Sequence, residues 1–360
     1  MNTLKKLFGI ALVATLVYSC SSDNNDPLPP IEIGSGSGLI VLNEGNSGQN
    51  NASITHFCFE TEVASQDVFF RQNGRLLGDL GNDILVYGGK IYIALGRSAT
   101  IEITDLEFNE IRQIRLTEGA FASPSREPMS LASHNGNVFI TCFSGYVLRL
   151  DTLTLEINAI VEVGDNPEGI AISNGFAFVA NSGGMNFLVG ADLDSTVSVI
   201  NLATFTEVDQ IVVGLNPMHI GVDATGNIIV HTAGNWVDIP AKLHRINAST
   251  GTVDRTFENV TPSNFAMSGD IAFYYSFDWS TMTAQFVEFN TITQTSRNFI
   301  NDPSVIFNPH AISVNRGNGN IYISNAEFIG DGSVFAFDAN GDKLFEFPAG
   351  VWPKRIVVLR

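Results

Sequence analysis

The sequence predicts an all-β chain that folds as a seven-bladed β-propeller, closed by the C-terminal strand joining the first blade. Three observations support this: a Pro-centred turn that recurs every 39 to 50 residues, the same order of short strands in each unit, and a C-terminal segment without a unit of its own. The composition agrees, because 44% of the residues are hydrophobic and 33 are Gly, with little helical periodicity. Such chains form many short strands joined by turns.

The Pro-centred turn sets the length of the repeat. It occurs at Pro128, Pro167, Pro217, Pro262, Pro309 and Pro353, with separations of 39, 50, 45, 47 and 44 residues. The segment GNDI at 81–84 occupies the same place one period earlier, without the proline. Propeller blades have about this period, roughly 40 to 50 residues.

Each unit shows the same order of four strands. In one unit these are IAI at 170–172, FAFVAN at 176–181, VSVIN at 197–201 and VDQIVVG at 208–214. Apolar and polar residues alternate in these segments, as in strands whose two faces pack differently. The predicted units are 80–116, 125–165, 166–215, 216–260, 261–306 and 307–352.

The first unit lacks its innermost strand. The segments GLIVLNEGN at 38–46, ASITHFCFE at 52–60 and EVASQDVFF at 62–70 are expected to supply its three outer strands. The tail 353–360, PKRIVVLR, has the pattern of an innermost strand, so we expect it to complete the first blade. Such closure leaves no open end, whereas the alternative, an open solenoid, would need capping.

The N-terminus has the pattern of an export signal. Lys5 and Lys6 precede an apolar run at 7–17, which is shorter than the roughly 20 residues that span a bilayer. The run ends in VYSC at 17–20, which resembles a bacterial lipobox. That resemblance implies cleavage before Cys20 and acylation of its sulfur; the alternative is an ordinary signal peptide with an incidental Cys. The expected domains are a signal peptide at 1–19, a lipidated Cys with a Pro/Gly/Ser linker at 20–37, and the propeller at 38–360.

The acidic segment SSDNND at 21–26 resembles the surface-export signal of Bacteroidetes lipoproteins. The resemblance implies an outer-membrane lipoprotein that faces the cell exterior. The formal net charge of −18 argues against nucleic-acid binding, because such a surface repels phosphate backbones. Cys58 and Cys142 fall in different units, so we expect free buried thiols, and no Cys/His spacing indicates a metal site.

Loop lengths locate a candidate binding face. The connections between second and third strands are long at 181–196, 232–242, 277–284 and 325–333, and nearly minimal at 95–99 and 143–145. They emerge on the same face as the Pro-centred turns, and insertions gathered on one face are typical of binding. The candidate ligand-binding residues there are Phe187, Asn235, Trp236, Asp238, Asp278, Trp279, Glu327 and Phe328. We expect the two Trp side chains to clamp a flat ligand; the alternative is that they pack the loops onto the rim.

Polar residues of the turns are expected near the axis on this face. They are Glu127, Asn166, Glu168, Asn216, His219, Asn264, Asn308, His310 and Arg355. His219 and His310 are added to the ligand-binding candidates, although they belong to non-adjacent blades. The alternative is that these residues form the solvated lining of a channel.

Two resemblances extend this interpretation. Phrases such as NPEGIAISNGFAFVAN, which starts at Asn166, resemble the YncE-like and NHL/YVTN-repeat propellers over 39–360, and they specify fold better than function. The segment Leu42 to Asp79 is similar to the start of the Bacteroidetes propeller lipoproteins that include the BtuG-type corrinoid binders. That resemblance implies capture of a corrinoid such as cobalamin and a TonB-dependent transporter as partner.

Catalysis is not expected. The chain has no G-x-S-x-G, H-E-x-x-H or P-loop motif, and nothing indicates a cofactor. The prediction is therefore a non-catalytic surface lipoprotein that binds a ligand on the long-loop face. Two alternatives stay open: an envelope propeller for protein interaction or structure, and a lactonase-like hydrolase with a metal held by Glu168, Asn216 and Asn308.

Overall fold

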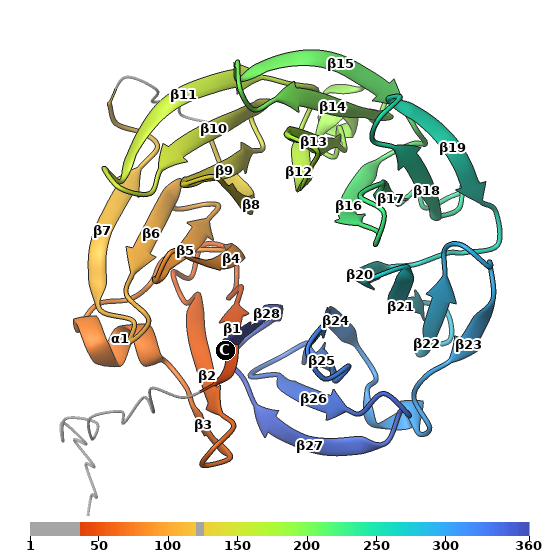
Figure 1. The fold of residues 1–360 in the computed structure, drawn as a ribbon. Helices are drawn as coiled ribbons and strands as arrows, with labels where there is room; N and C mark the ends of the chain where they lie inside the picture. The colour runs from red at the N-terminus through yellow and green to blue at the C-terminus, as the bar shows by residue number, and fades with distance from the viewer. Residues whose placement is uncertain (1–36, 120–125, 360) are drawn as a thin grey trace, which may run out of the picture. The chain divides into compact units, whose positions relative to one another are not determined.

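A computed structural model describes residues 37–119 and 126–359, which form seven four-stranded antiparallel sheets around a central axis (Figure 1). The predicted signal peptide, Cys20 and the linker up to residue 36 lie outside the described residues. The seven-bladed prediction is confirmed, and the blade limits follow the repeat of the Pro-centred turns.

In the first three blades the strands follow one another outward from the axis. The first blade consists of β28 (Pro353–Leu359), β1 (Gly38–Asn43), β2 (Ser53–Cys58) and β3 (Val63–Ser65). The second consists of β4 (Gly81–Tyr87), β5 (Lys90–Leu95), β6 (Thr100–Thr104) and β7 (Glu110–Arg115). The third consists of β8 (Pro128–His134), β9 (Asn137–Cys142), β10 (Tyr146–Asp151) and β11 (Glu156–Glu162).

The other four blades repeat this order. The fourth consists of β12 (Pro167–Ser173), β13 (Phe176–Asn181), β14 (Thr196–Asn201) and β15 (Thr206–Val212). The fifth consists of β16 (Pro217–Val222), β17 (Ile228–Thr232), β18 (Lys242–Asn247) and β19 (Thr252–Phe257). The sixth consists of β20 (Asn264–Ser268), β21 (Ile271–Asp278), β22 (Thr283–Asn290) and β23 (Ser296–Asn298). The seventh consists of β24 (Pro309–Val314), β25 (Ile321–Asn325), β26 (Ser333–Phe337) and β27 (Lys343–Pro348).

The C-terminal strand closes the ring as predicted. β28 pairs antiparallel with β1, in a register that places Gly38 opposite Leu359 and Leu42 opposite Arg355. The first blade is therefore built from both ends of the propeller sequence. This pairing leaves no unpaired end repeat, which a linear repeat array would have to cap.

The prediction of a strand over 62–70 is only partly correct. β3 ends at Ser65, and Val68–Asn73 forms the helix α1. Val68 and Phe69 are both buried and pack in one core cluster with Phe108 of the second blade. A strand would send two successive side chains to opposite faces, whereas a helix turns both of them toward the core.

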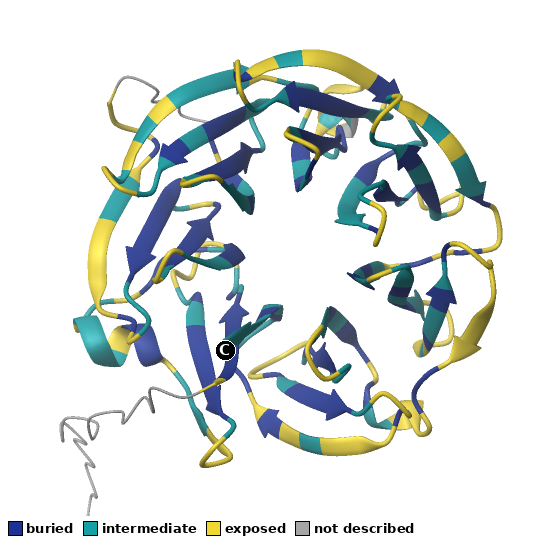
Figure 2. Cartoon of the chain, in the orientation of Figure 1, coloured by how far each residue is buried: buried dark blue, intermediate teal, exposed yellow. Residues whose placement is uncertain are grey.

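The core lies between the faces of neighbouring sheets. Middle strands such as β13 and β17 are buried on both faces, because apolar side chains from adjacent blades cover them. The outermost strands β15 and β7 carry mostly exposed residues, and Figure 2 shows this rim in yellow. Cys58 and Cys142 are buried free thiols in different blades, as predicted.

The Asn-Pro turns explain how the innermost strands begin. Asn166 and Asn216 have positive φ angles of 48° and 60°, which Asn tolerates better than most residues. The following proline opens an innermost strand, where the edge toward the axis needs no N–H donor. The pairing shifts register directly afterwards, between Pro167 and Ile170 and between Pro217 and Ile220. Such bulges re-aim the side chains next to them, which here include Glu168 and His219.

Candidate functional site

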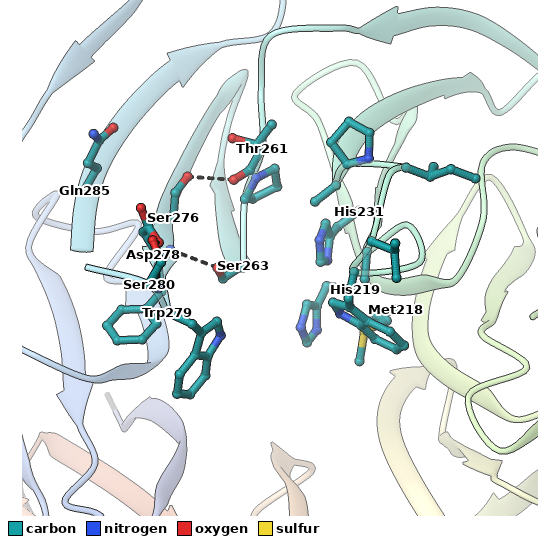
Figure 3. A pocket seen from close by; sticks show the side chains of 18 of the residues that line it. Met218, His219, His231, Thr261, Ser263, Ser276, Asp278, Trp279, Ser280 and Gln285 are labelled. Atoms are coloured by element: carbon teal, nitrogen blue, oxygen red, sulfur yellow. Dashed lines mark hydrogen bonds between the residues drawn. The ribbon is translucent and has the colours of Figure 1, made fainter. Parts of the chain in front are cut away.

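A cavity of about 930 Å³ lies on the long-connection face, between the fifth and sixth blades (Figure 3). The connection after β17 forms one wall, the β21–β22 hairpin forms the other, and the segment leading into β20 lies between them. The lining residues used below are Met218, His219, His231, Trp236, Asp238, Thr261, Ser263, Ser276, Asp278 and Trp279.

The first wall is a loop that presents a tryptophan. The Asn235 Oδ1 atom accepts hydrogen bonds from the backbone N–H groups of Val237, Asp238 and Ile239, and the Asn235 amide donates to Asp238 Oδ1 at 2.7 Å. This network holds Trp236 at a φ of 58°, which is strained for a bulky side chain. The indole is nevertheless 68% exposed, so burial in the core does not compensate for the strain.

The second wall differs from the prediction of a long loop at 277–284. β21 and β22 extend through most of this segment, and only residues 279–282 form the turn. Asp278 stabilises the turn by accepting hydrogen bonds from the N–H and hydroxyl groups of Ser280 at 2.8 and 2.6 Å, and these bonds lower the pKa of Asp278. Trp279, 67% exposed, packs only its edge against Phe277 at a centroid distance of 4.7 Å.

Two histidines lie between the walls. His219 follows the bulge of β16, and its ring stacks on that of His231 of β17, with centroids 5.4 Å apart and planes within 10°. Burial, reinforced by the charges of His231, Arg355, Lys354 and His310, holds the pKa of His219 well below its usual value. Burial likewise lowers the pKa of His231 to about 4. Both imidazoles are therefore neutral at pH 7.

The segment leading into β20 adds polar groups across the cavity from the histidines. The Ser276 hydroxyl donates to the Thr261 carbonyl at 2.6 Å, and the Phe277 N–H donates to the Ser263 hydroxyl at 3.0 Å. Figure 3 shows these residues across the cavity from His219 and His231. The site thus combines aromatic walls with a few fixed polar groups, as ligand pockets commonly do.

The structure brings together only part of the predicted site. Trp236, Asp238, Asp278, Trp279 and His219 line the cavity, and Asn235 supports the loop that carries Trp236. Glu327, Phe328 and His310 lie outside the lining of this cavity. Phe187 belongs to the 3-10 turn Asn186–Val189, and its side chain is not among the described ones. The connection after β25 carries Glu327, which accepts from Asn325, and Phe328, which packs against Phe307.

His310 belongs instead to a charged cluster at the axis, centred on Glu44. The Lys354 ammonium group lies 2.6 Å from Glu44 Oε1, and His310 Nε2 lies 3.5 Å from Oε2 without forming a hydrogen bond of good geometry. Burial opposes ionisation of Glu44, but the neighbouring His310 and the hydrogen bond and charge of Lys354 outweigh it and lower its pKa to about 2. Arg355 pairs with Asp83 nearby, Nε to Oδ1 at 2.9 Å. Glu44 could not be predicted as a site residue from the sequence, because Lys354 stands more than three hundred positions away along the chain.

The turn asparagines Asn166, Asn216 and Asn308 are held by hydrogen bonds within the protein. Asn216 and Asn308 are 1% and 4% exposed. The Asn308 amide donates to the Ala326 carbonyl at 3.0 Å, and the Asn166 amide donates to the Phe143 carbonyl at 2.9 Å. These bonds fasten the second-to-third-strand connections to the Pro-centred turns.

Among the residues that the structure describes, Glu168 is the axial acid whose pKa is strongly raised. Its side chain keeps some contact with solvent, yet protein atoms crowd it. Burial raises its pKa to about 7 against the opposing charges of Lys354 and Arg355. This acid is therefore partly protonated at neutral pH.

Within residues 37–119 and 126–359, no group of three or more His, Cys, Asp or Glu side chains is placed to hold a metal ion. No helix in that part of the chain is long and apolar enough to cross a membrane.

Comparison with known proteins supports the fold alone. No protein-family model and no curated protein matches the chain. A solved structure of Kuenenia stuttgartiensis hydrazine synthase is similar with a TM-score of 0.61 and 14% identity, over 76% of this chain and 92% of that one. A functionally unknown protein from Desulfotomaculum acetoxidans is similar with a TM-score of 0.62 and 15% identity, over 90% and 99%. The computationally designed Ika8 protein is similar with a TM-score of 0.56 and 11% identity, over 89% of this chain and 96% of that one. The fold that the chain shares with these structures is the β-propeller.

Proposed function

We propose that this propeller is a non-catalytic binding protein that captures a flat, amphipathic organic ligand between Trp236 and Trp279, and that the ligand is a corrinoid. The observation that carries the proposal is that two largely exposed indoles, on neighbouring blades, line one cavity. Exposed tryptophans with little packing of their own are favourable contacts for a flat ligand, because each offers a large rigid surface.

The size and chemistry of the cavity support a large ligand. Its volume of about 930 Å³ lies near the upper end of the range for small-molecule pockets, roughly 300–1,000 Å³. The polar groups of Ser263, Asp278 and the two histidines offer contacts for the polar edge of such a molecule. Identification of the ligand as a corrinoid rests on the resemblance of Leu42 to Asp79 to the BtuG-type lipoproteins.

The N-terminal sequence supports the outer membrane as the location of this binding activity. A lipid on Cys20 would hold the propeller at the outer membrane, with the linker up to residue 37 as a spacer. In that setting a TonB-dependent transporter is the proposed partner, because a captured corrinoid is too large to enter the cell without one.

A second observation favours contact with another protein on the same face. Val189, Val237 and Ile329, from the long connections of three blades, are each more than four-fifths exposed. Exposed connections of this kind are where proteins commonly contact their partners. We propose that this rim contacts the transporter. Co-purification of the transporter from membranes should be lost in a V189S/I329S variant, which leaves the cavity lining intact, and unchanged recovery would refute the contact.

Titration calorimetry with cyanocobalamin tests the ligand proposal. The unaltered protein should bind, and a W236A/W279A variant should lose at least about 30-fold in affinity, since each stacked aromatic contributes roughly 1–3 kcal/mol. Leu153→Ala is the matched control, because it removes an exposed apolar side chain from the β10–β11 turn, far from the cavity lining. Absence of heat with the unaltered protein, or equal affinity of the double variant, would refute the proposal.

A further inference from the structure

His231 is a buried histidine without a proper hydrogen bond. The residue is only 1% exposed, and neither ring nitrogen has a partner at hydrogen-bond geometry. A contact with the Pro262 carbonyl only partly offsets the burial that lowers its pKa. Buried polar groups are nearly always paired, so an unpaired imidazole beside a cavity calls for an explanation.

His219 lies over this ring and is open to the cavity. It makes no hydrogen bond with any described residue and retains partial exposure, while His231 stacks against it. A neutral imidazole without a hydrogen-bond partner has a lone pair available at its unprotonated ring nitrogen. That lone pair can accept a hydrogen bond or bind a transition metal.

The neighbouring side chain favours a metal. Met218 places a thioether in the same cavity, and thioether and imidazole donors suit soft and borderline transition metals. However, two imidazoles and a thioether do not make the closed four-ligand shell of a structural site. Among the described residues no further His, Cys or carboxylate completes the set. A metal that arrives already held by an organic chelator needs only one more donor from the protein.

We infer that His219 supplies a ring nitrogen to the metal of a planar, tetrapyrrole-type chelate bound between the two tryptophans, with His231 as the residue that positions the His219 ring. This inference rests on the proposed function and specifies how its ligand is held. Coordination exchanges one neutral donor for another: the imidazole nitrogen forms a bond to the metal, a metal-bound water leaves as water, and no electron is transferred.

Visible spectroscopy with two corrinoids tests the inference. In aquacobalamin the metal carries an exchangeable water, whereas cyanocobalamin offers a tightly held cyanide at that position. The unaltered protein should shift the spectrum of aquacobalamin on binding and leave that of cyanocobalamin unchanged. His219→Ala should abolish the shift and weaken aquacobalamin binding by about tenfold or more, while cyanocobalamin affinity changes little. The retained cyanocobalamin affinity shows that His219→Ala still folds.

Controls separate this inference from the proposed function. His134→Ala, which removes a histidine of β8 outside the cavity lining, should behave like the unaltered protein. His231→Ala should reduce the spectral shift and His231→Phe should retain it, since only the second keeps a flat ring against His219. If both corrinoids bind without a spectral change, or if His219→Ala keeps the shift, coordination is refuted and capture stands. If neither corrinoid binds, both proposals fall. If free Cu⁺ or Ni²⁺ binds tightly and this binding depends on His219, the site binds a metal ion without a chelator, and the inference of a bound chelate is wrong.

Discussion

The cavity between the fifth and sixth blades and the axial cluster around Glu44 lie on the same face of the propeller, but they are built in opposite ways. At the axis, Glu44 is paired with Lys354 and Asp83 with Arg355. In the cavity, Trp236 and Trp279 are exposed and the ring nitrogens of His231 lack partners. Groups that satisfy one another stabilise a fold, whereas groups left without partners are available to a ligand. We therefore expect the axial cluster to stabilise the fold and the cavity to bind the ligand.

The largest expected effect on stability comes from breaking the axial pair. Lys354→Met leaves Glu44 without its cationic partner, which costs up to about 3–5 kcal/mol in a fully buried pair. Both side chains are partly exposed, at 28% and 20%, so we expect a loss of about 2 kcal/mol. Urea unfolding at pH 7 measures it, and cyanocobalamin affinity should stay unchanged. A variant that is fully stable but binds ligand poorly would reverse the assignment of the two regions.

The pair of Glu44 and Lys354 makes the free energy of unfolding depend on pH. The pKa of Glu44 is about 2 in the folded protein and near 4.5 in the unfolded chain, so its stabilising contribution is present above pH 4.5 and disappears as the pH falls toward 2. The difference in unfolding free energy between the unaltered protein and Lys354→Met should therefore narrow over that interval. A constant difference would show that Lys354 stabilises the fold through contacts other than its charge.

A substitution in the wall of the cavity should have a smaller effect on stability. Asn235→Ala removes the acceptor for three backbone N–H groups of the loop that carries Trp236. The loop is exposed, so global stability should change by less than about 0.5 kcal/mol. Ligand affinity should fall about fivefold to tenfold, because binding must now order the loop. Unchanged affinity with the same calorimetric ligand would show that the position of Trp236 does not depend on this network.

A separate effect on stability concerns the protonation of Glu168. Its pKa is raised from 4.5 to about 7, so the folded protein holds a proton that the unfolded chain releases between these values. The contribution of this proton to stability is present below pH 4.5 and is lost as the pH rises to about 7, so Glu168→Gln should raise the Tm at pH 8.5 more than at pH 5. Glu162→Gln, at an exposed position of β11, serves as the control. An equal change in Tm at both pH values would contradict the raised pKa.

Much of the architecture could be predicted because it repeats along the chain. The Pro-centred turns reveal the blade period, and the tail from Pro353 has no other place than the first blade. Trp236 could be placed at the cavity because it stands in a long connection, whereas Trp279 stands in the four-residue turn 279–282 of the β21–β22 hairpin. The helix α1 was missed because Val68 and Phe69 suit a strand as well as they suit a helix.

The unpredicted parts of the site depend on contacts between distant segments. His231 stands in the middle of an apolar strand, IIVHT, where it looks like a core residue. Glu44 and Lys354 meet only because the C-terminal strand closes the ring. The prediction placed Phe328 and His310 in one site with Trp236 only because all three lie on the same face of the propeller. Loop lengths do not reveal which neighbouring connections enclose a cavity.

Tryptophan fluorescence tests the central claim most directly. The chain has three tryptophans, and Trp352 contacts His310 at the axis rather than lining the cavity. In a Trp352→Phe variant the remaining indoles are Trp236 and Trp279, so their emission reports on the cavity alone. If the ligand binds between Trp236 and Trp279, cyanocobalamin should quench their fluorescence in a saturable way, with the same Kd that calorimetry gives for the unaltered protein. Calorimetric binding without any quenching in this variant would place the ligand elsewhere and contradict the account.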